Sequence, residues 1–280
     1  MATAPSLAIS RQRTLKRTVH CSGVGVHTGA HCTVRLEAAA IDSGRSFISS
    51  KGKVLPAHFD RLCGSAYQTV IGNDSFRVQT PEHLLAAAML LDIDNLHIHI
   101  DGPEVPIFDG SALPWIQLFH KAGIHTQDAP AQYASVGAHS LSMNESTLSV
   151  EPSDALSLRV SVDFPHPAIG YQQAFFAHSE LLHQLAPAQT FGFKADLPKL
   201  KAIGLAHGAD LSNTLVYDSH ALINPQKRRF VQEPLHHKAL DIIGDFSLLN
   251  QRIRADITAH RPSHALNQQW LKAHALIQET

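Results

Sequence analysis

The sequence has few cysteines, no marked excess of charge and no long apolar run. Cys21, Cys32 and Cys63 form no C-x-x-C pair, which argues against a disulfide framework and against a cysteine zinc site. Lys and Arg total 23 and Asp and Glu total 24, so the net charge of −1 offers no general attraction for nucleic acid or an anionic membrane. No apolar run has transmembrane length, and Met1 to Ser10 is too short and polar for a secretory signal. We therefore expect a cytoplasmic protein, with no nucleic-acid partner and no transmembrane segment, whose mature form is the whole chain.

The pattern of apolar residues predicts a mixed α+β protein in two halves. A hydrophobic content of 44% over 280 residues can form the core of one large domain or of two ordinary ones. Strands, a helix, a strand and a helix follow one another in the first half, although residues 41–53 have the polar composition of a loop. Proline, glycine and small residues occupy 129–138, and alternating strands then restart. We therefore predict domains over 1–128 and 129–280, the second with a βαβ-like insert at about 194–218.

Residues 233–250 form the pattern around which the candidate site is organised. Pro234 suits a first helical turn, and apolar residues recur after it at helical spacing, so we predict a helix with one face in the core. On the neighbouring face His237, Asp241 and Asp245 follow at i, i+4 and i+8, about one turn apart. An imidazole and a carboxylate at that spacing can bind one metal ion and suit zinc, while an intrahelical His–Asp ion pair is the alternative. A third metal ligand must come from elsewhere.

A second helix start lies at Thr80-Pro81-Glu82-His83. Thr80 is a good N-cap, Pro81 suits the first helical position, and Glu82 stands where the helix dipole favours an anion. Adjacent helical residues point about 100° apart, so a metal held by His83 would leave Glu82 beside it, near a bound water. That is the geometry of a general base, and an ordinary acidic first turn is the alternative. The chain contains 20 histidines, which weakens any argument that rests on one of them.

Two further motifs lie in the second half, one around Thr190 and one around His264. Taken with the two helix starts and three turn-rich segments, they resemble the zinc-dependent UDP-3-O-acyl-N-acetylglucosamine deacetylases, which catalyse the committed step of lipid A synthesis. The segments that carry the resemblance are 23–29, 80–84, 102–111, 163–169, 190–193, 237–245 and 263–267. Each segment alone is a weak signal, but seven in the family's order make a specific match.

The resemblance implies a fold and a metal site. It implies two similar α+β domains, each a sheet packed on two helices, with the helices of both halves sandwiched between the sheets and the site at the domain junction. It also implies that His83, His237 and Asp241 bind Zn²⁺ and that Glu82 is the general base. A catalytic zinc site of this kind keeps one position for water.

The same resemblance assigns the other site residues. His264, held by Asp245, would be the cationic or proton-donating partner, and Thr190 would hydrogen-bond the developing oxyanion. Lys238 would lie near the nucleotide diphosphate, and the insert would shape an apolar passage for the acyl chain. The residues expected to contact the substrate, a UDP-linked acylated amino sugar, are Phe191, Lys238 and Arg261.

Four departures from the family pattern bear on substrate fit. Gln189 and Ser263 replace the usual Arg and Gly, Arg261 replaces the usual Lys, and the run 209–213 differs. Two other functions therefore stay open: a catalytically idle, zinc-containing paralogue that binds a nucleotide sugar, and a zinc hydrolase of a different N-acyl substrate. Intact Glu82 and His264 argue against the idle paralogue, because a binding site needs neither base nor acid. We expect a monomer.

Overall fold

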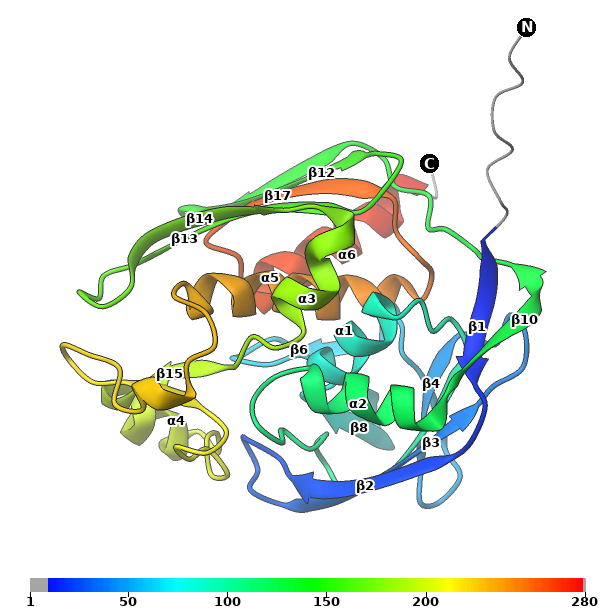
Figure 1. Cartoon of the computed structure of the whole chain (residues 1–280), viewed down its shortest axis with the longest axis horizontal. Coiled ribbons are helices and arrows are strands. Elements are labelled where there is room, and N and C mark those ends of the chain that lie inside the picture. The colour runs from blue at the N-terminus through cyan, green and yellow to red at the C-terminus, as the bar shows by residue number, and fades with distance from the viewer. Residues whose placement is uncertain (1–9, 279–280) are drawn as a thin grey trace, which may run out of the picture.

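Two five-stranded sheets enclose a layer of helices in the computed structural model, which describes residues 10–278 (Figure 1). The strand order of the first sheet is β2-β3-β9-β4-β5, and that of the second is β11-β12-β17-β13-β14. The first sheet consists of β2 (Val19–Val24), β3 (His31–Ala38), β4 (Arg45–Ser49), β5 (Val54–Pro56) and β9 (Leu96–Asp101). The second consists of β11 (His139–Met143), β12 (Ser146–Pro152), β13 (Ser157–Phe164), β14 (Gly170–Phe176) and β17 (Ala255–His260).

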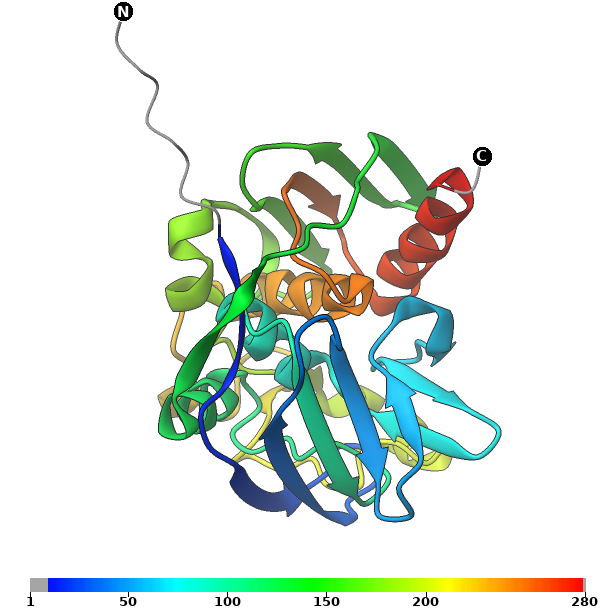
Figure 2. The same ribbon diagram turned by 90° about the vertical axis from the view of Figure 1, so that its right-hand side faces the viewer.

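The two halves repeat one topology. In each sheet a single neighbouring pair is parallel, β4 with β9 and β13 with β17, and the other pairs are antiparallel. Each half also supplies two helices to the middle layer, seen between the sheets in Figure 2. These helices are α1 (Glu82–Leu90), α2 (Leu113–Ala122), α5 (Glu233–Phe246) and α6 (His264–Gln278). The predicted α+β class, with sheet-plus-helix halves, is confirmed, whereas the boundary between residues 128 and 129 stays a prediction.

The central helices are buried because the apolar faces of both sheets pack against them. Val34 and Leu36 of β3, and Leu158 and Val160 of β13, are at most 1% exposed and belong to one continuous hydrophobic core. In α1 every residue from Glu82 to Ala88 is buried, including the polar ones. Polar side chains on these helices therefore need partners inside the protein.

Shorter elements surround the sandwich. The strands β1 (Arg11–Leu15) and β10 (Ile124–Pro130) pair with each other, as do the parallel strands β15 (Phe191–Phe193) and β16 (Leu215–Tyr217). A three-stranded sheet holds β6 (Leu62–Gly64), β7 (Val70–Asn73) and β8 (Phe76–Gln79). The short helices are η1 (Phe59–Arg61), η2 (His178–Glu180), α3 (Leu181–Leu185), η3 (Lys194–Asp196), α4 (Leu197–Ala202), η4 (Pro225–Lys227) and η5 (Ser247–Leu249). β15 and β16 pair in parallel, with α4 between them in sequence, and the bounds of the predicted insert, about 194–218, stay a prediction.

Three local predictions are wrong. Residues 41–53 contain β4, a strand inside the first sheet, whose polar Arg45 and Ser46 are buried by neighbouring elements rather than exposed in a loop. Thr80 has a left-handed backbone (φ 54°), and its hydroxyl oxygen lies within hydrogen-bonding distance of Gln68 Oε1 and Glu104 Oε1 instead of capping α1. The predicted helix over 233–250 is α-helical only to Phe246, and η5 follows it.

No helix within residues 10–278 combines the length and the apolar character needed to cross a membrane. The segment weighed above as a secretory signal, Met1 to Ser10, lies outside the described residues except for Ser10.

Gly244 allows α5 to pass close to the start of α1, and replacing it should disturb the site. A Cβ at Gly244 would lie 2.5 Å from the Glu82 carbonyl oxygen and 2.8 Å from the Glu82 Cβ. We expect Gly244→Ala to lower the free energy of unfolding by about 1–3 kcal/mol through overpacking and to lower kcat by displacing Glu82. Denaturant unfolding and a kinetic assay measure both effects, with Gly137→Ala as the control because that position is open. Equal stability of the two variants would contradict the close approach.

Candidate metal centre and active site

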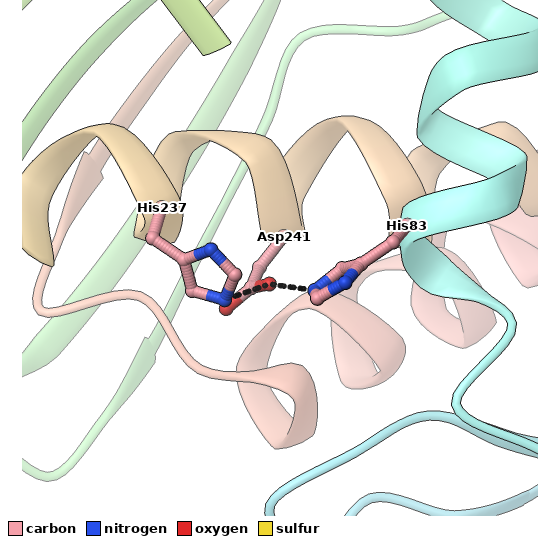
Figure 3. Close-up of side chains that lie close together, drawn as sticks. All are labelled: His83, His237 and Asp241. Atoms are coloured by element: carbon pink, nitrogen blue, oxygen red, sulfur yellow. Dashed lines mark ion pairs between the residues drawn. The ribbon is translucent and has the colours of Figure 1, made fainter. Parts of the chain in front are cut away.

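His83, His237 and Asp241 converge on one point, as Figure 3 shows. Asp241 Oδ1 lies 3.5 Å from His237 Nε2 and 3.9 Å from His83 Nε2, and one ligand atom from each residue lies within 4.8 Å of the others. His237 and Asp241 come from successive turns of α5, whereas His83 comes from the first turn of α1. All three residues are at most 5% exposed. The structure thus brings together the three predicted metal ligands.

The electrostatics of these residues suit a divalent cation. Burial, followed by the neighbouring His237, lowers the pKa of His83 to about 3, and burial also lowers the pKa of His237. Burial alone would raise the pKa of Asp241, but Lys238 and the histidines outweigh it and hold this pKa below its usual range. Because the Nδ1–H of His237 can donate to the Ala188 carbonyl oxygen at 3.2 Å, its Nε2 lone pair is directed at the centre. Two neutral imidazoles and one carboxylate form a donor set that fits Zn²⁺.

Glu82 and His264 face each other beside these ligands. His264 Nε2 lies 3.7 Å from Glu82 Oε1 and 3.9 Å from Asp241 Oδ2. Burial raises the pKa of Glu82 to about 8, with His264 opposing the shift and Asp245 adding to it. Burial alone would lower the pKa of His264, but Asp245 and Asp241 outweigh it and raise the pKa to about 9. A carboxyl group and an imidazolium of this kind can exchange protons with a molecule bound between them.

The Asp245 carboxylate contacts the Nδ1 edge of the His264 ring, opposite the Nε2 edge that faces Glu82. Its Oδ2 accepts from His264 Nδ1 at 2.8 Å and from Asn267 Nδ2 at 2.8 Å, and the carboxylate is 0% exposed. Its Oδ1 accepts from the Thr69 hydroxyl at 2.5 Å. Asn267 belongs to the segment 263–267 that carries the family resemblance, whereas no sequence motif points to Thr69.

Comparison with known proteins agrees with this geometry. A family model described as UDP-3-O-acyl N-acetylglycosamine deacetylase matches residues 12–276. The chain belongs to this deacetylase family. The UDP-3-O-acyl-N-acetylglucosamine deacetylase of Syntrophotalea carbinolica is 38% identical over 267 residues, which cover 93% of this chain and 86% of the relative. The enzymes of the same name from Thermosynechococcus vestitus and Helicobacter pylori are 38% and 36% identical, over 97% and 94% of this chain and 97% and 90% of their own lengths. The resemblance inferred from the seven motifs is confirmed.

In this deacetylase family member, the segment around Thr190 lies beside the metal ligands. The Thr190 amide donates to the Gly110 carbonyl oxygen at 2.7 Å, and the Phe191 ring centroid lies 6.2 Å from that of His237. Lys238 Nζ is 6.0 Å from the Phe191 ring centroid and donates to Asp241 Oδ2 at 2.8 Å. These contacts place an aromatic ring, directly after Thr190 in sequence, and a cation at one side of the centre.

The residues that depart from the deacetylase family pattern have clear local roles. Gln189 is buried, and its side-chain amide donates to the Asp109 carbonyl oxygen at 2.6 Å. Ser263 Oγ accepts from the Leu266 amide at 3.3 Å, which satisfies an N–H group in the first turn of α6. Arg261, in contrast, forms an ion pair with Glu145 in the turn between β11 and β12. The structure therefore brings side chains of Glu82, His264, Asp245, Phe191 and Lys238 close to the predicted ligands or to one another, whereas the guanidinium of Arg261 points to Glu145.

Proposed function

We propose that this protein removes the N-acetyl group from UDP-3-O-acyl-N-acetylglucosamine by zinc-dependent hydrolysis, the reaction that the family resemblance assigns to lipid A synthesis. The observation that carries the proposal is the convergence of a His–His–Asp ligand set with Glu82 and His264, which lie 3.7 Å apart. His83, His237 and Asp241 would hold the zinc ion. When bound, zinc acidifies water and polarises a carbonyl group.

Glu82 and His264 would transfer the protons of this hydrolysis. Glu82 takes a proton from the attacking water as the new carbon–oxygen bond forms at the acetyl carbonyl. His264 then protonates the amine nitrogen as the carbon–nitrogen bond breaks, giving acetate and the free amine. Thr190 would donate a hydrogen bond to the carbonyl oxygen as negative charge develops on it.

The remaining predicted residues would hold the substrate. Lys238 has a half-buried side chain at the edge of the centre and would meet the diphosphate, joined by Arg261 once that side chain leaves Glu145. A small hydrophobic cluster joins the insert to the β13–β14 turn: Ile169 of that turn packs with Leu215 and Tyr217, and Phe191 and Phe193 pack against this cluster. This aromatic and aliphatic surface beside His237 suits the acyl chain.

A metal analysis coupled to a deacetylation assay tests the proposal. We expect about one zinc ion per chain and release of acetate from UDP-3-O-acyl-N-acetylglucosamine. Stoichiometric zinc without acetate release would support the idle paralogue. Release of acyl groups only from other N-acylated compounds would support a hydrolase of different specificity, for which the changes at Gln189 and 209–213 leave room.

The dependence of kcat/KM on pH should be bell-shaped if His264 is the acid. Activity rises as Glu82 loses its proton and falls as His264 loses its own, because the base acts deprotonated and the acid acts protonated. Asp245 raises the pKa of His264, so Asp245→Asn should move the descending limb to lower pH. His264→Gln should remove that limb. A descending limb that persists in His264→Gln would identify another acid, and Lys238 would be examined first.

A further inference from the structure

Thr69 occupies a position between the two proton-transferring groups. It precedes β7, is 1% exposed, and its carbonyl oxygen accepts from the Thr80 amide at 3.0 Å. The β7–β8 hairpin therefore returns the chain to a point opposite Thr69, two residues before Glu82. This short hairpin fixes the distance between Thr69 and the start of α1.

The chemistry of its neighbours sets the direction of the Thr69 hydroxyl. Gln268 Nε2 can only donate, and it donates to Thr69 Oγ1 at 3.1 Å while also donating to the Gly64 carbonyl oxygen at 3.1 Å. An ionised carboxylate can only accept, so the hydroxyl proton is directed at Asp245 Oδ1, 2.5 Å away. His264 Nδ1 lies 3.3 Å from the same hydroxyl oxygen.

The backbone of Thr69 faces the opposite catalytic group. Its amide N–H donates to both carboxyl oxygens of Glu82, each at 3.4 Å. One residue thus contacts the base through its backbone and the partner of the acid through its side chain. His264 and Asn267 both bond to Asp245 Oδ2, and the Thr69 hydroxyl bonds to Oδ1, so both carboxylate oxygens are held and the plane of the carboxylate is fixed.

We propose that Thr69 is a positioning residue for the deacetylation, holding the Asp245–His264 pair at a fixed place relative to Glu82. This inference rests on the proposed function. Without the hydroxyl, the Asp245 carboxylate loses a buried hydrogen bond, and the His264 ring is free to leave the position in which its Nε2 faces Glu82 at 3.7 Å. The side chains that contact Thr69 are those of Glu82, Asp245, His264 and Gln268 rather than the three metal ligands, so its effect should appear in turnover rather than in binding.

Two substitutions that separate the hydroxyl group from the shape of the side chain test this role. Thr69→Val keeps the branched shape and removes the hydroxyl, and we expect kcat to fall roughly 10–100-fold with KM and zinc content unchanged. Thr69→Ser keeps the hydroxyl and should restore most of kcat. Thr14→Val is the matched control: the Thr14 hydroxyl is also buried and bonded, to the Asn95 carbonyl oxygen, but lies in β1 away from the site. Its kcat should equal that of the unmodified protein.

A second measurement does not depend on turnover. The proton shared by His264 Nδ1 and Asp245 should give a resonance far downfield of the amide region in the proton NMR spectrum of the zinc-loaded protein, and His264→Gln identifies it. Thr69→Val should shift or broaden this resonance, whereas Thr14→Val should not. If Thr69→Val does not fold, Gln268→Met removes the group that orients the hydroxyl and should move the same resonance and kcat in the same directions.

The outcomes separate this inference from the proposed function. If the unmodified protein releases no acetate from the substrate, the proposed function fails, and the NMR spectra still show whether Thr69 holds the His264–Asp245 pair. A Thr69→Val protein with unchanged kcat, or with an unchanged downfield resonance, would overturn the positioning role. Equal losses of kcat in Thr69→Ser and Thr69→Val would do the same, because the loss would then not depend on the presence of the hydroxyl group.

Discussion

His237→Ala should abolish both zinc retention and deacetylation. The side chain supplies one of three protein ligands, and its Nε2 is held toward the centre by the bond between Nδ1 and the Ala188 carbonyl oxygen. Two ligands, His83 and Asp241, would remain, which is fewer than catalytic zinc sites use. Elemental analysis after dialysis, together with the acetate-release assay, measures the two losses.

The neighbouring His236 provides a matched control for this prediction. It lies on the same helix, but its ring stacks on Phe230 with centroids 4.3 Å apart, away from the ligand set. His236→Ala should keep both zinc and activity. A His237→Ala protein that retains stoichiometric zinc and turns over would refute the ligand assignment.

Glu82→Ala should keep the zinc and lose most turnover. Glu82 is adjacent to a ligand in sequence, but its carboxyl group faces His264 and the Thr69 amide rather than completing the ligand set. Removing a positioned base should reduce kcat on the order of 10²-fold or more. Zinc content and kcat are measured on the same preparation, so that the two effects can be separated.

Glu82→Gln is the companion variant because it preserves the shape of the side chain and cannot take a proton. We expect the same loss of kcat as in Glu82→Ala, again with full zinc content. If zinc content fell in parallel with activity in either variant, Glu82 would have to be counted among the metal ligands.

The sequence predicts those parts of the site that depend on helical spacing alone. His237, Asp241 and Asp245 stand on one face because residues four apart in a helix lie one above the other, which is a local property. Likewise, a Pro81-Glu82-His83 helix start puts base and ligand side by side whatever the rest of the fold does. The roles of Thr190 and His264 came from the family resemblance, since nothing in their local pattern brings them to α5.

The wrong predictions for β4 and for Thr80 have one physical origin. β4 was missed because a strand buried on both faces can contain Arg45 and Ser46 when its neighbours supply their hydrogen bonds, as the Ser247 carbonyl oxygen does for Arg45 at 2.8 Å. Thr80 was assigned as a cap because its chemistry suits one, yet contacts with Gln68 and Glu104 hold its backbone in the left-handed region. In each case long-range contacts outweighed a local preference.

The sequence by itself determined the apolar and the polar face of α5, the sheet-forming alternation and the ligand types, because each follows from residues a few positions apart. Only the tertiary structure decided that His83 meets α5 and that Arg261 pairs with Glu145. It also decided that Thr69 contacts both Glu82 and Asp245, which lies 176 residues from Thr69 in the sequence. Such contacts depend on how β7, α1, α5 and α6 pack, and packing is set by the whole core, which no local spacing encodes.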